Sequence, residues 1–189
     1  MAMAALKPLP RAGFTTMPWA NGLGTTHEIA VDPAPGPSGA PFRWRLSMAD
    51  LSGPGPFSVL PGVDRVLVLL AGDGVVLHVG GEPPAPLTRH GSIRFPGDVE
   101  TRLEMAPGPG RDLNLMWDRE RASGIVDVLG AGDGLAIDGP LAFAVALGGP
   151  AALEVDGEAV TLGDDDAVRI DAGHALAVHA GDVYVARIA

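Results

Sequence analysis

The stretch Ala71–Glu82, AGDGVVLHVGGE, can be aligned with Leu147–Glu158, LGGPAALEVDGE, 76 residues further along the chain. In the same overlay Ser92–Gly97 (SIRFPG) falls near Ala167–Gly173 (AVRIDAG). Each half then contains a strand, a glycine turn, a second strand, a Pro-rich or acidic turn, and a third strand with a central arginine. This internal repeat predicts two copies of one small β-unit.

Short apolar segments, many of them β-branched, continue this pattern through the rest of the chain. Gly, Pro and Asp clusters separate them, and helical periodicity is nearly absent. The pattern is typical of an all-β sandwich or barrel. The stretch Asp32–Pro41, DPAPGPSGAP, predicts a surface loop. The segments predicted to be strands are Val63–Leu70, Val75–Val79, Ser92–Phe95, Leu113–Trp117, Leu141–Leu147, Ala167–Ile170 and Val183–Ile188.

Composition excludes several classes of protein. The 189 residues are 47% hydrophobic and include no cysteine, which leaves no disulfide framework, zinc finger or thiolate nucleophile. The net charge of −10 lies in the second half, because residues 1–95 hold seven Lys or Arg against six Asp or Glu. Since acidic surfaces repel phosphate backbones, we expect no nucleic-acid partner.

The hydropathy pattern also bears on location. No apolar run reaches the roughly 18–20 residues of a membrane-spanning helix, so we expect no membrane association. The opening MAMAALKPLPRAGF has neither the apolar core nor the basic start of a signal peptide. We interpret it as a short lead-in to a cytoplasmic protein.

Two glycine-punctuated copies resemble a bicupin, which consists of two fused cupin-like jelly-roll β-barrels. Four ordered blocks are more specific, because they resemble motifs of the HutD/Ves family. The one visible departure is Leu23, where the family often has a third glycine. The four blocks are Trp19–Ala30 (WANGLGTTHEIA), Phe42–Ala49 (FRWRLSMA), Gly55–Arg65 (GPFSVLPGVDR) and Arg111–Arg119 (RDLNLMWDR).

The resemblance implies a cytoplasmic cupin-like protein associated in bacteria with histidine utilisation, in an accessory or regulatory role. It implies small-molecule binding and supplies no settled catalytic residues. We expect an N-terminal lobe over residues 1–121, which carries the motifs, and a C-terminal lobe over residues 122–189. The boundary stays open because strands can be exchanged between lobes.

The histidine pattern argues against a cupin metal centre. Many cupins hold a metal with His-x-His, a nearby Glu and a third His after a Pro-x-Gly turn, and this chain has no His-x-His. Asp98, Val99 and Glu100 follow the Pro-Gly turn at Pro96-Gly97 in the first repeat, where the third histidine is expected. The chain also lacks G-x-S-x-G, a dinucleotide loop and G-K-[ST]. We therefore predict no metal and no cofactor. The five histidines are His27, His78, His90, His174 and His179.

Strand alternation in Phe42–Met48 separates two faces. One face carries only large apolar side chains and predicts core. The other carries Arg43, Arg45 and Ser47, and is either a solvated face or the wall of a polar pocket. The family block favours Arg45 and Ser47 as pocket residues.

Further candidates lie on other strands. Arg65 could hold a carboxylate through its planar fork with Asp64 orienting it, unless the two form an ordinary salt bridge at a strand entrance. Asn114 and Met116 share one face, where Asn114 could bond an amide or formyl group or be a turn-side residue. Thr26 and Glu28 share another face, where Glu28 is either a partner of an arginine or exposed. The predicted ligand-binding residues are Thr26, Glu28, Arg45, Ser47, Asp64, Arg65, Asn114 and Met116.

This composition suits a small organic acid such as N-formylglutamate or urocanate. We predict a metal-independent carboxylate-binding protein with an accessory or regulatory role. One alternative is a metal-independent cupin isomerase or hydrolase that uses Glu28 or Asp64 as a base. Another is a structural or interaction protein without a working pocket. The oligomeric state stays open, a homodimer included.

Overall fold

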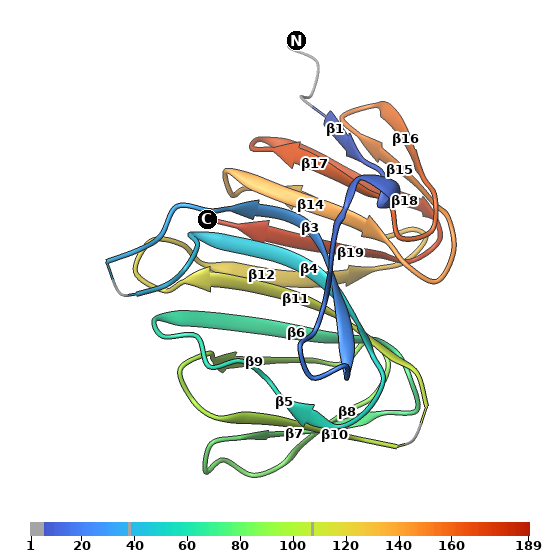
Figure 1. The fold of residues 1–189 in the computed structure, drawn as a ribbon. Helices are drawn as coiled ribbons and strands as arrows, with labels where there is room; N and C mark the ends of the chain where they lie inside the picture. The colour runs from blue at the N-terminus through green and yellow to red at the C-terminus, as the bar shows by residue number, and fades with distance from the viewer. Residues whose placement is uncertain (1–5, 38, 107) are drawn as a thin grey trace. The chain divides into compact units, whose positions relative to one another are not determined.

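Nearly all of the described chain is β-structure. The computed structural model describes residues 6–37, 39–106 and 108–189, and 59% of these described residues are strand (Figure 1). The one helical element in these ranges is the short 3-10 helix η1 (Arg11–Gly13). The prediction of an all-β fold is confirmed.

The chain divides into two compact units. One is Thr15–Gly124, called here the N-terminal unit. The other, called the C-terminal unit, combines the residues up to Phe14 with Ile125–Ala189. Domains were expected at residues 1–121 and 122–189, with strand exchange left open. The observed division falls three residues later, and the start of the chain belongs with its end.

The N-terminal unit consists of two antiparallel sheets. The six-stranded sheet has the order β2 (Thr15–Pro18), β3 (Gly24–Asp32), β4 (Trp44–Leu51), β11 (Gly110–Asp118), β6 (Val63–Ala71), β9 (Ser92–Pro96). The four-stranded sheet has the order β5 (Gly55–Pro56), β10 (Thr101–Met105), β7 (Val75–Val79), β8 (Ala85–Leu87).

The core of this unit lies between its two sheets. Leu67 and Leu69 of β6 pack with Leu77 of β7 and Leu103 of β10 in one buried cluster. Because side chains alternate along a strand, every second residue of β6 and its neighbours points into this interior. The opposite face is also apolar: Leu46 and Met48, predicted to be core, are fully buried.

The C-terminal unit also has two antiparallel sheets. Its larger sheet has the order β1 (Leu6–Leu9), β17 (Ala167–Asp171), β14 (Leu141–Ala146), β19 (Val183–Ile188), β12 (Gly124–Leu129). The smaller has the order β13 (Gly134–Ile137), β18 (His174–Ala180), β15 (Ala151–Val155), β16 (Glu158–Leu162). Small and branched residues such as Ala144, Leu153 and Val185 form the core between them.

The two units share a strand order. In the larger sheets, β4-β11-β6-β9 of the N-terminal unit corresponds to β12-β19-β14-β17 of the C-terminal unit. In the smaller sheets, β10-β7-β8 corresponds to β18-β15-β16. The strands aligned by the repeat, β7 and β15, occupy equivalent positions, so the same arrangement of strands occurs twice in the chain.

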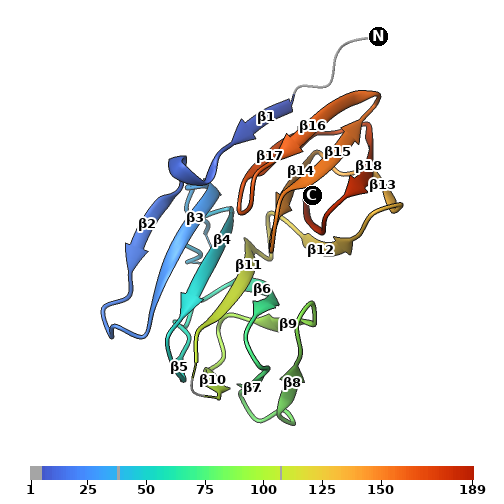
Figure 2. The ribbon, with the colours of Figure 1, turned by 90° about the vertical axis from the view of Figure 1, so that its right-hand side faces the viewer.

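The start of the chain differs from the expected lead-in. Leu6–Leu9 forms β1, which pairs antiparallel with β17, as Figure 2 shows. The backbone N–H of Arg11 then donates to Asp166 Oδ1 at 2.7 Å. Residues 1–5 lie outside the described residues. Leu6 packs on the apolar core of the C-terminal unit, which is why these few residues form a strand there.

The other local expectations compare well with the structure. Each segment predicted as a strand lies within or overlaps one, and Val75–Val79 and Val183–Ile188 have the predicted bounds. In the predicted loop, Asp32 ends β3 and the described residues after it form no strand or helix; Ser38 lies outside the described residues. No helix among the described residues is long and apolar enough to cross a membrane.

Candidate functional site

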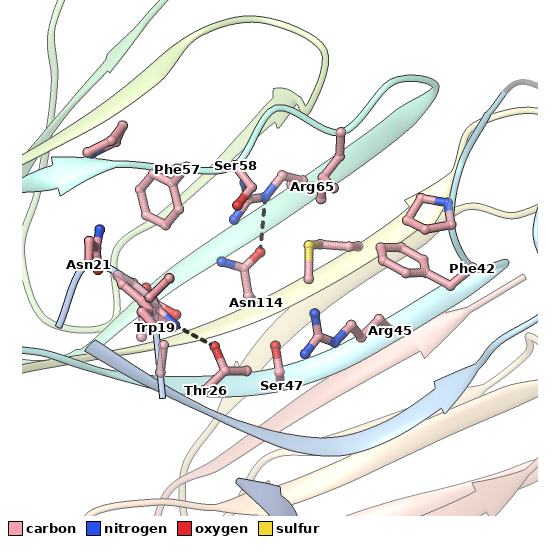
Figure 3. A pocket seen from close by; sticks show the side chains of 17 residues that line it. Trp19, Asn21, Thr26, Phe42, Arg45, Ser47, Phe57, Ser58, Arg65 and Asn114 are labelled. Carbon is pink, nitrogen blue, oxygen red and sulfur yellow. Dashed lines mark hydrogen bonds between the residues drawn. The ribbon is translucent and has the colours of Figure 1, made fainter. Parts of the chain in front are cut away.

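A cavity of about 540 Å³ opens in the N-terminal unit (Figure 3). It lies on the face of the six-stranded sheet that also carries the core residues Leu67 and Leu69. Its polar side chains come mainly from β3, β4, β6 and β11, and its apolar wall comes from the connecting segments. The principal lining residues are Trp19, Thr26, Phe42, Arg45, Ser47, Phe57, Arg65, Asp112, Asn114 and Met116.

The register of three adjacent strands brings the polar groups together. Met116 of β11 pairs with Arg45 of β4 on one side and with Arg65 of β6 on the other. Asn114 likewise lies opposite Ser47. Residues directly across a ladder point to the same face, so these side chains form adjacent rungs of the cavity floor.

Arg65 is the most deeply buried cation of the site, with 4% of its surface exposed. Its guanidinium lies 4.7 Å from the centre of the Phe57 ring and 5.1 Å from that of Phe95. Nε donates to Asn114 Oδ1 at 3.3 Å (Figure 3). Burial lowers the pKa of Arg65 to about 10, while the charge of Asp112 acts in the opposite direction. Arg65 therefore remains cationic at neutral pH, and no carboxylate of the described residues forms an ion pair with it.

Arg45 differs because it already has a counter-charge. Its Nε lies 2.7 Å from Glu28 Oε2, although the N–H is not aligned for a hydrogen bond. Both side chains are about one-fifth exposed. The predicted pairing of Glu28 with an arginine is therefore present, and the charge of Arg45 is balanced before any ligand arrives.

Asp112 also lines the cavity, and it was not among the predicted site residues. It is completely buried, and neither carboxylate oxygen has a hydrogen-bond partner among the described residues. Burial raises its pKa to about 7, although the charge of Arg65 and the nearby Asn114 side chain oppose this shift. Asp112 shares the strand parity of Asn114 and Met116, so the same alternation could have identified it.

Part of the cavity lining comes from the turn in Trp19–Gly24, which contributes Trp19 and Asn21. Gly22 adopts a positive φ of 69°, and Asn21 Oδ1 accepts from the Leu23 N–H at 3.0 Å. A Cβ on Gly24 would lie 2.8 Å from the Trp19 ring, so a glycine is needed there for the indole to pack. The indole Nε1–H then donates to Thr26 Oγ1 at 2.8 Å. This segment is a loop, so strand alternation could not place Trp19 at the site.

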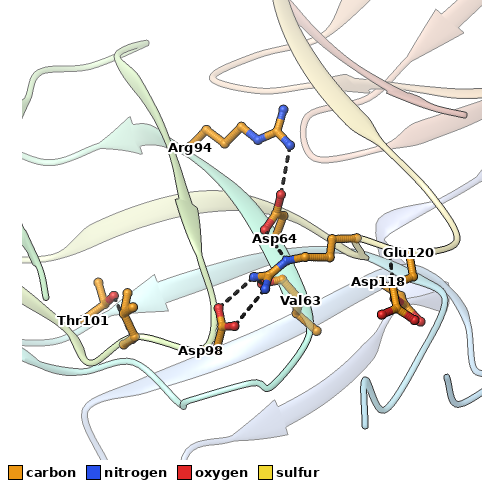
Figure 4. A network of polar contacts seen from close by, with 9 residues as sticks. Val63, Asp64, Arg94, Asp98, Thr101, Asp118 and Glu120 are labelled. Carbon is orange, nitrogen blue, oxygen red and sulfur yellow. Dashed lines mark hydrogen bonds and ion pairs between the residues drawn. The ribbon is translucent and has the colours of Figure 1, made fainter. Parts of the chain in front are cut away.

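The cavity includes most of the predicted ligand-binding residues. Glu28 reaches it only through Arg45. Asp64 lies elsewhere, because it precedes Arg65 on β6 and therefore points to the other face. Its carboxylate accepts from Arg94 at 2.9 Å and from Arg119 at 3.0 Å, in the polar network of Figure 4. Asp64 therefore does not orient Arg65. The predicted residues that line the cavity are Thr26, Arg45, Ser47, Arg65, Asn114 and Met116.

Four of the five histidines, His27, His78, His174 and His179, contact acidic neighbours. The buried His27 lies between Thr16 and Asp50, with its Nε2 2.9 Å from Asp50 Oδ2. His78 contacts Glu104 at 2.9 Å. Within the described ranges, no group of three or more His, Cys, Asp or Glu side chains is placed to hold a metal ion.

The arrangement suits recognition of an anion. Arg65 offers a planar, desolvated guanidinium, and its two flanking rings are attracted to the cation without neutralising it. Asn114 bonds only the Nε of Arg65, and a buried charge without a counter-charge bears its desolvation penalty alone. An anionic ligand would therefore satisfy a requirement that the protein groups leave open.

Comparison with known sequences identifies relatives. The HutD family model matches residues 11–185. The chain is 38% identical over 119 residues to an "Uncharacterized 21.2 kDa protein in hutC 3'region" of Pseudomonas putida, covering 63% of this chain and 62% of that protein. It is 39% identical over 111 residues to Protein Ves of Citrobacter koseri, covering 58% and 56%. The chain thus matches less than two-thirds of the length of these curated relatives.

Comparison with solved structures extends over the whole chain. HutD from Pseudomonas fluorescens SBW25 is 29% identical, with a TM-score of 0.82 over 97% of this chain and 98% of that one. A cupin 2 conserved barrel domain protein from Leptotrichia buccalis has a TM-score of 0.56 at 11% identity, over 87% and 88%, which shows the fold alone. The predictions of a cupin-like fold and of HutD/Ves resemblance are confirmed. Since the family model spans most of the sequence, the chain belongs to the HutD family.

Proposed function

We propose that the N-terminal unit binds a small organic carboxylate at Arg65, using protein groups and no metal. The observation that carries this proposal is the state of Arg65, a buried cation on a cavity wall without an acidic partner. The planar fork of an arginine matches a carboxylate bidentately. Burial between Phe57 and Phe95 strengthens that attraction, because the local dielectric constant is low.

The rest of the cavity favours a ligand with further polar atoms. Ser47 has a hydroxyl that can donate and accept, and Asn114 has an amide beside Arg65. Phe42 and Met116 supply apolar surface. A cavity of about 540 Å³ lies within the usual range for small-molecule sites.

The relatives suggest where such an acid comes from. One carries a name that places it in the hutC 3' region, and another is HutD, solved in a formate condition. We infer that the ligand is a carboxylated intermediate of histidine breakdown, like N-formylglutamate or urocanate. The protein would act in the cytoplasm as an accessory or regulatory component of histidine utilisation.

The positions of Glu28 and Asp64 support the alternative of a metal-independent isomerase or hydrolase less well than they support a binding protein. Glu28 is engaged by Arg45, and Asp64 lies outside the cavity in contact with Arg94 and Arg119. Neither carboxylate is positioned as a base over the cavity floor. The second alternative, a protein without a working pocket, is disfavoured by the cavity itself.

Thermal denaturation with a panel of acids tests the proposal. A ligand at a hundred times its Kd adds about 2.7 kcal/mol, which corresponds to a rise in Tm of roughly 5–10 °C for a chain of this size. We expect such a rise for N-formylglutamate, urocanate or a related acid. Arg65→Ala should abolish it, because the remaining lining cation is already paired with Glu28.

The matched control is Arg102→Ala, which removes an exposed arginine of β10 outside the cavity. This variant should keep the full shift. The proposal fails if no acid shifts the wild-type Tm at saturation, or if Arg65→Ala shifts as much as Arg102→Ala.

A further inference from the structure

Asp112 and Arg65 share one cavity but do not pair. Each influences the ionisation of the other, yet they form no ion pair, and both oxygens of Asp112 lack a hydrogen-bond partner within the described chain. An acid and a base that are buried together normally contact each other, because each otherwise bears its desolvation penalty alone. Their separation points to a group that would lie between them.

The direction of the Arg65 side chain fits this interpretation. Arg65 starts at the level of Met116 on β11, and its Nε reaches Asn114, two residues closer to Asp112. Asp112 lies opposite Ala49 of β4 and Leu69 of β6, at the apolar end of the cavity floor. A ligand carboxylate bound to the guanidinium would therefore approach Asp112.

Few charged groups act on Asp112. Arg65 of β6 favours its ionised form, and Asp50 of β4 opposes it. Asp50 is itself engaged by His27 and Arg111. Arg45, the other charged residue on the cavity wall, is paired with Glu28. Among the described residues, Arg65 is thus the one cation that favours the ionised form of Asp112, and the side chain of Asn114 acts in the same direction.

An anion bound to Arg65 removes this support. It neutralises the one cation that favours the Asp112 carboxylate and brings a second negative charge close to it. Two carboxylates that share a dry site ionise together only at a high electrostatic cost. A protonated Asp112 avoids the repulsion, and its O–H supplies a hydrogen bond to the ligand.

We propose that Asp112 is a ligand-contacting residue that takes up one proton from solvent when the carboxylate binds, and donates it in a hydrogen bond to the bound acid. No bond other than this O–H forms or breaks. The site thus takes an organic anion together with a proton. This inference rests on the proposed function, because it requires a carboxylate at Arg65.

Calorimetry of the full chain measures the proton directly. The probes are acetate, glutarate and N-formylglutamate, which have no titrating group between pH 6 and 9. Titrations at pH 8 in two buffers of different ionisation enthalpy give the number of protons taken up. We expect about one proton per carboxylate, and a Kd that rises about tenfold per pH unit above pH 7, where the free Asp112 begins to ionise.

Asp112→Asn isolates the residue. The amide keeps the shape of the side chain and its donor capacity but cannot titrate, so its Kd should be the same from pH 6 to 9, with no proton uptake. The control is Asp73→Asn, in an exposed turn of the same unit, which should show the wild-type uptake. If Asp112→Asn does not fold, the number of protons that the wild-type protein takes up on binding still tests the proposed role of Asp112.

The outcomes separate the two proposals. Binding without proton uptake overturns the role of Asp112 and leaves the carboxylate site standing. Proton release, with binding lost in Asp112→Asn, would mean that an ionised Asp112 accepts an N–H of the ligand, which also contradicts the inference. If none of the probes binds even at pH 6, the carboxylate site itself fails, and the inference fails with it.

Discussion

At the scale of single residues, the site combines a buried cation that no carboxylate of the described residues pairs with, Arg65, and a buried carboxylate, Asp112, whose two oxygens have no hydrogen-bond partner among those residues. Buried polar groups in native proteins are nearly always paired, and exceptions concentrate at functional sites. The two flanking phenylalanines, Phe57 and Phe95, stabilise the Arg65 cation, but their rings supply no hydrogen-bond donor to the Asp112 carboxylate. The free site is therefore less stable than it would be with a ligand, which is the physical basis for binding.

Asp112 also makes stability depend on pH. Its pKa is raised by burial from 3.8 to about 7, so between about pH 4 and 7 the folded state holds a proton that the unfolded chain has lost. The free energy of unfolding falls as pH rises through that window. At pH 8 the wild-type protein must hold an ionised carboxylate in a buried position, and Asp112→Asn removes that cost. The variant should therefore be more stable than wild type at pH 8, by about 2–4 kcal/mol.

Urea denaturation checks this difference in stability. The gap between Asp112→Asn and wild type should shrink at pH 5, where the wild-type carboxyl is protonated in the folded state. If Asp112→Asn is instead less stable than wild type at pH 8, hydrogen-bond donors stabilise the ionised Asp112 carboxylate in the folded protein, which contradicts this prediction.

At the scale of elements, β1 shows how little chain is needed to complete a sheet. It contains a proline and only four residues, yet it pairs along its length with β17, and Leu6 packs on the core. Without it, β17 would be an edge strand with unpaired backbone groups on one side.

Removal of residues 1–9 should therefore expose β17. We expect its backbone amides to exchange with solvent at least about tenfold faster, because local opening no longer breaks the pairing with β1. Hydrogen exchange followed by mass spectrometry measures this rate. Lys7→Ala, which alters an exposed side chain of β1 but keeps the strand, is the control. Unchanged exchange in the truncated chain would contradict the proposed role of β1.

At the scale of the whole molecule, one strand order occurs twice, but the described cavity belongs to one unit. Its lining residues all lie within Thr15–Gly124. In the C-terminal unit, the equivalent interior of β14 carries Ala142, Ala144 and Ala146 in a packed cluster. The same arrangement of strands thus carries a polar site in one unit and an apolar core in the other.

Ligand binding should therefore protect the two units unequally. With a carboxylate present, amides of β4, β6 and β11 should exchange more slowly, while those of β15 and β18 should keep their rates, because a ligand stabilises the conformations that contain its site. Hydrogen exchange of the wild type and of Arg65→Ala, each with and without ligand, tests this. Equal slowing in both units would show that the site is coupled to the whole chain.

Short-range patterns in the sequence determined much of this protein. Alternation and turn residues predicted the strands, including Val75–Val79 and Val183–Ile188 with their bounds. Alternation also placed Ser47 and Asn114 on the faces where they now line the cavity, because the side-chain period of a strand is a property of the backbone alone.

Only the tertiary structure decided what those faces meet. Register across β4, β11 and β6 brought Arg45, Met116 and Arg65 into one row, and pairing between strands far apart in sequence cannot be derived from one strand's pattern. Loop packing placed Trp19 at the cavity, and burial turned Asp112 from an ordinary acid into an unpaired one. Desolvation and the choice of neighbours depend on long-range contacts, and those exist only once the chain has folded.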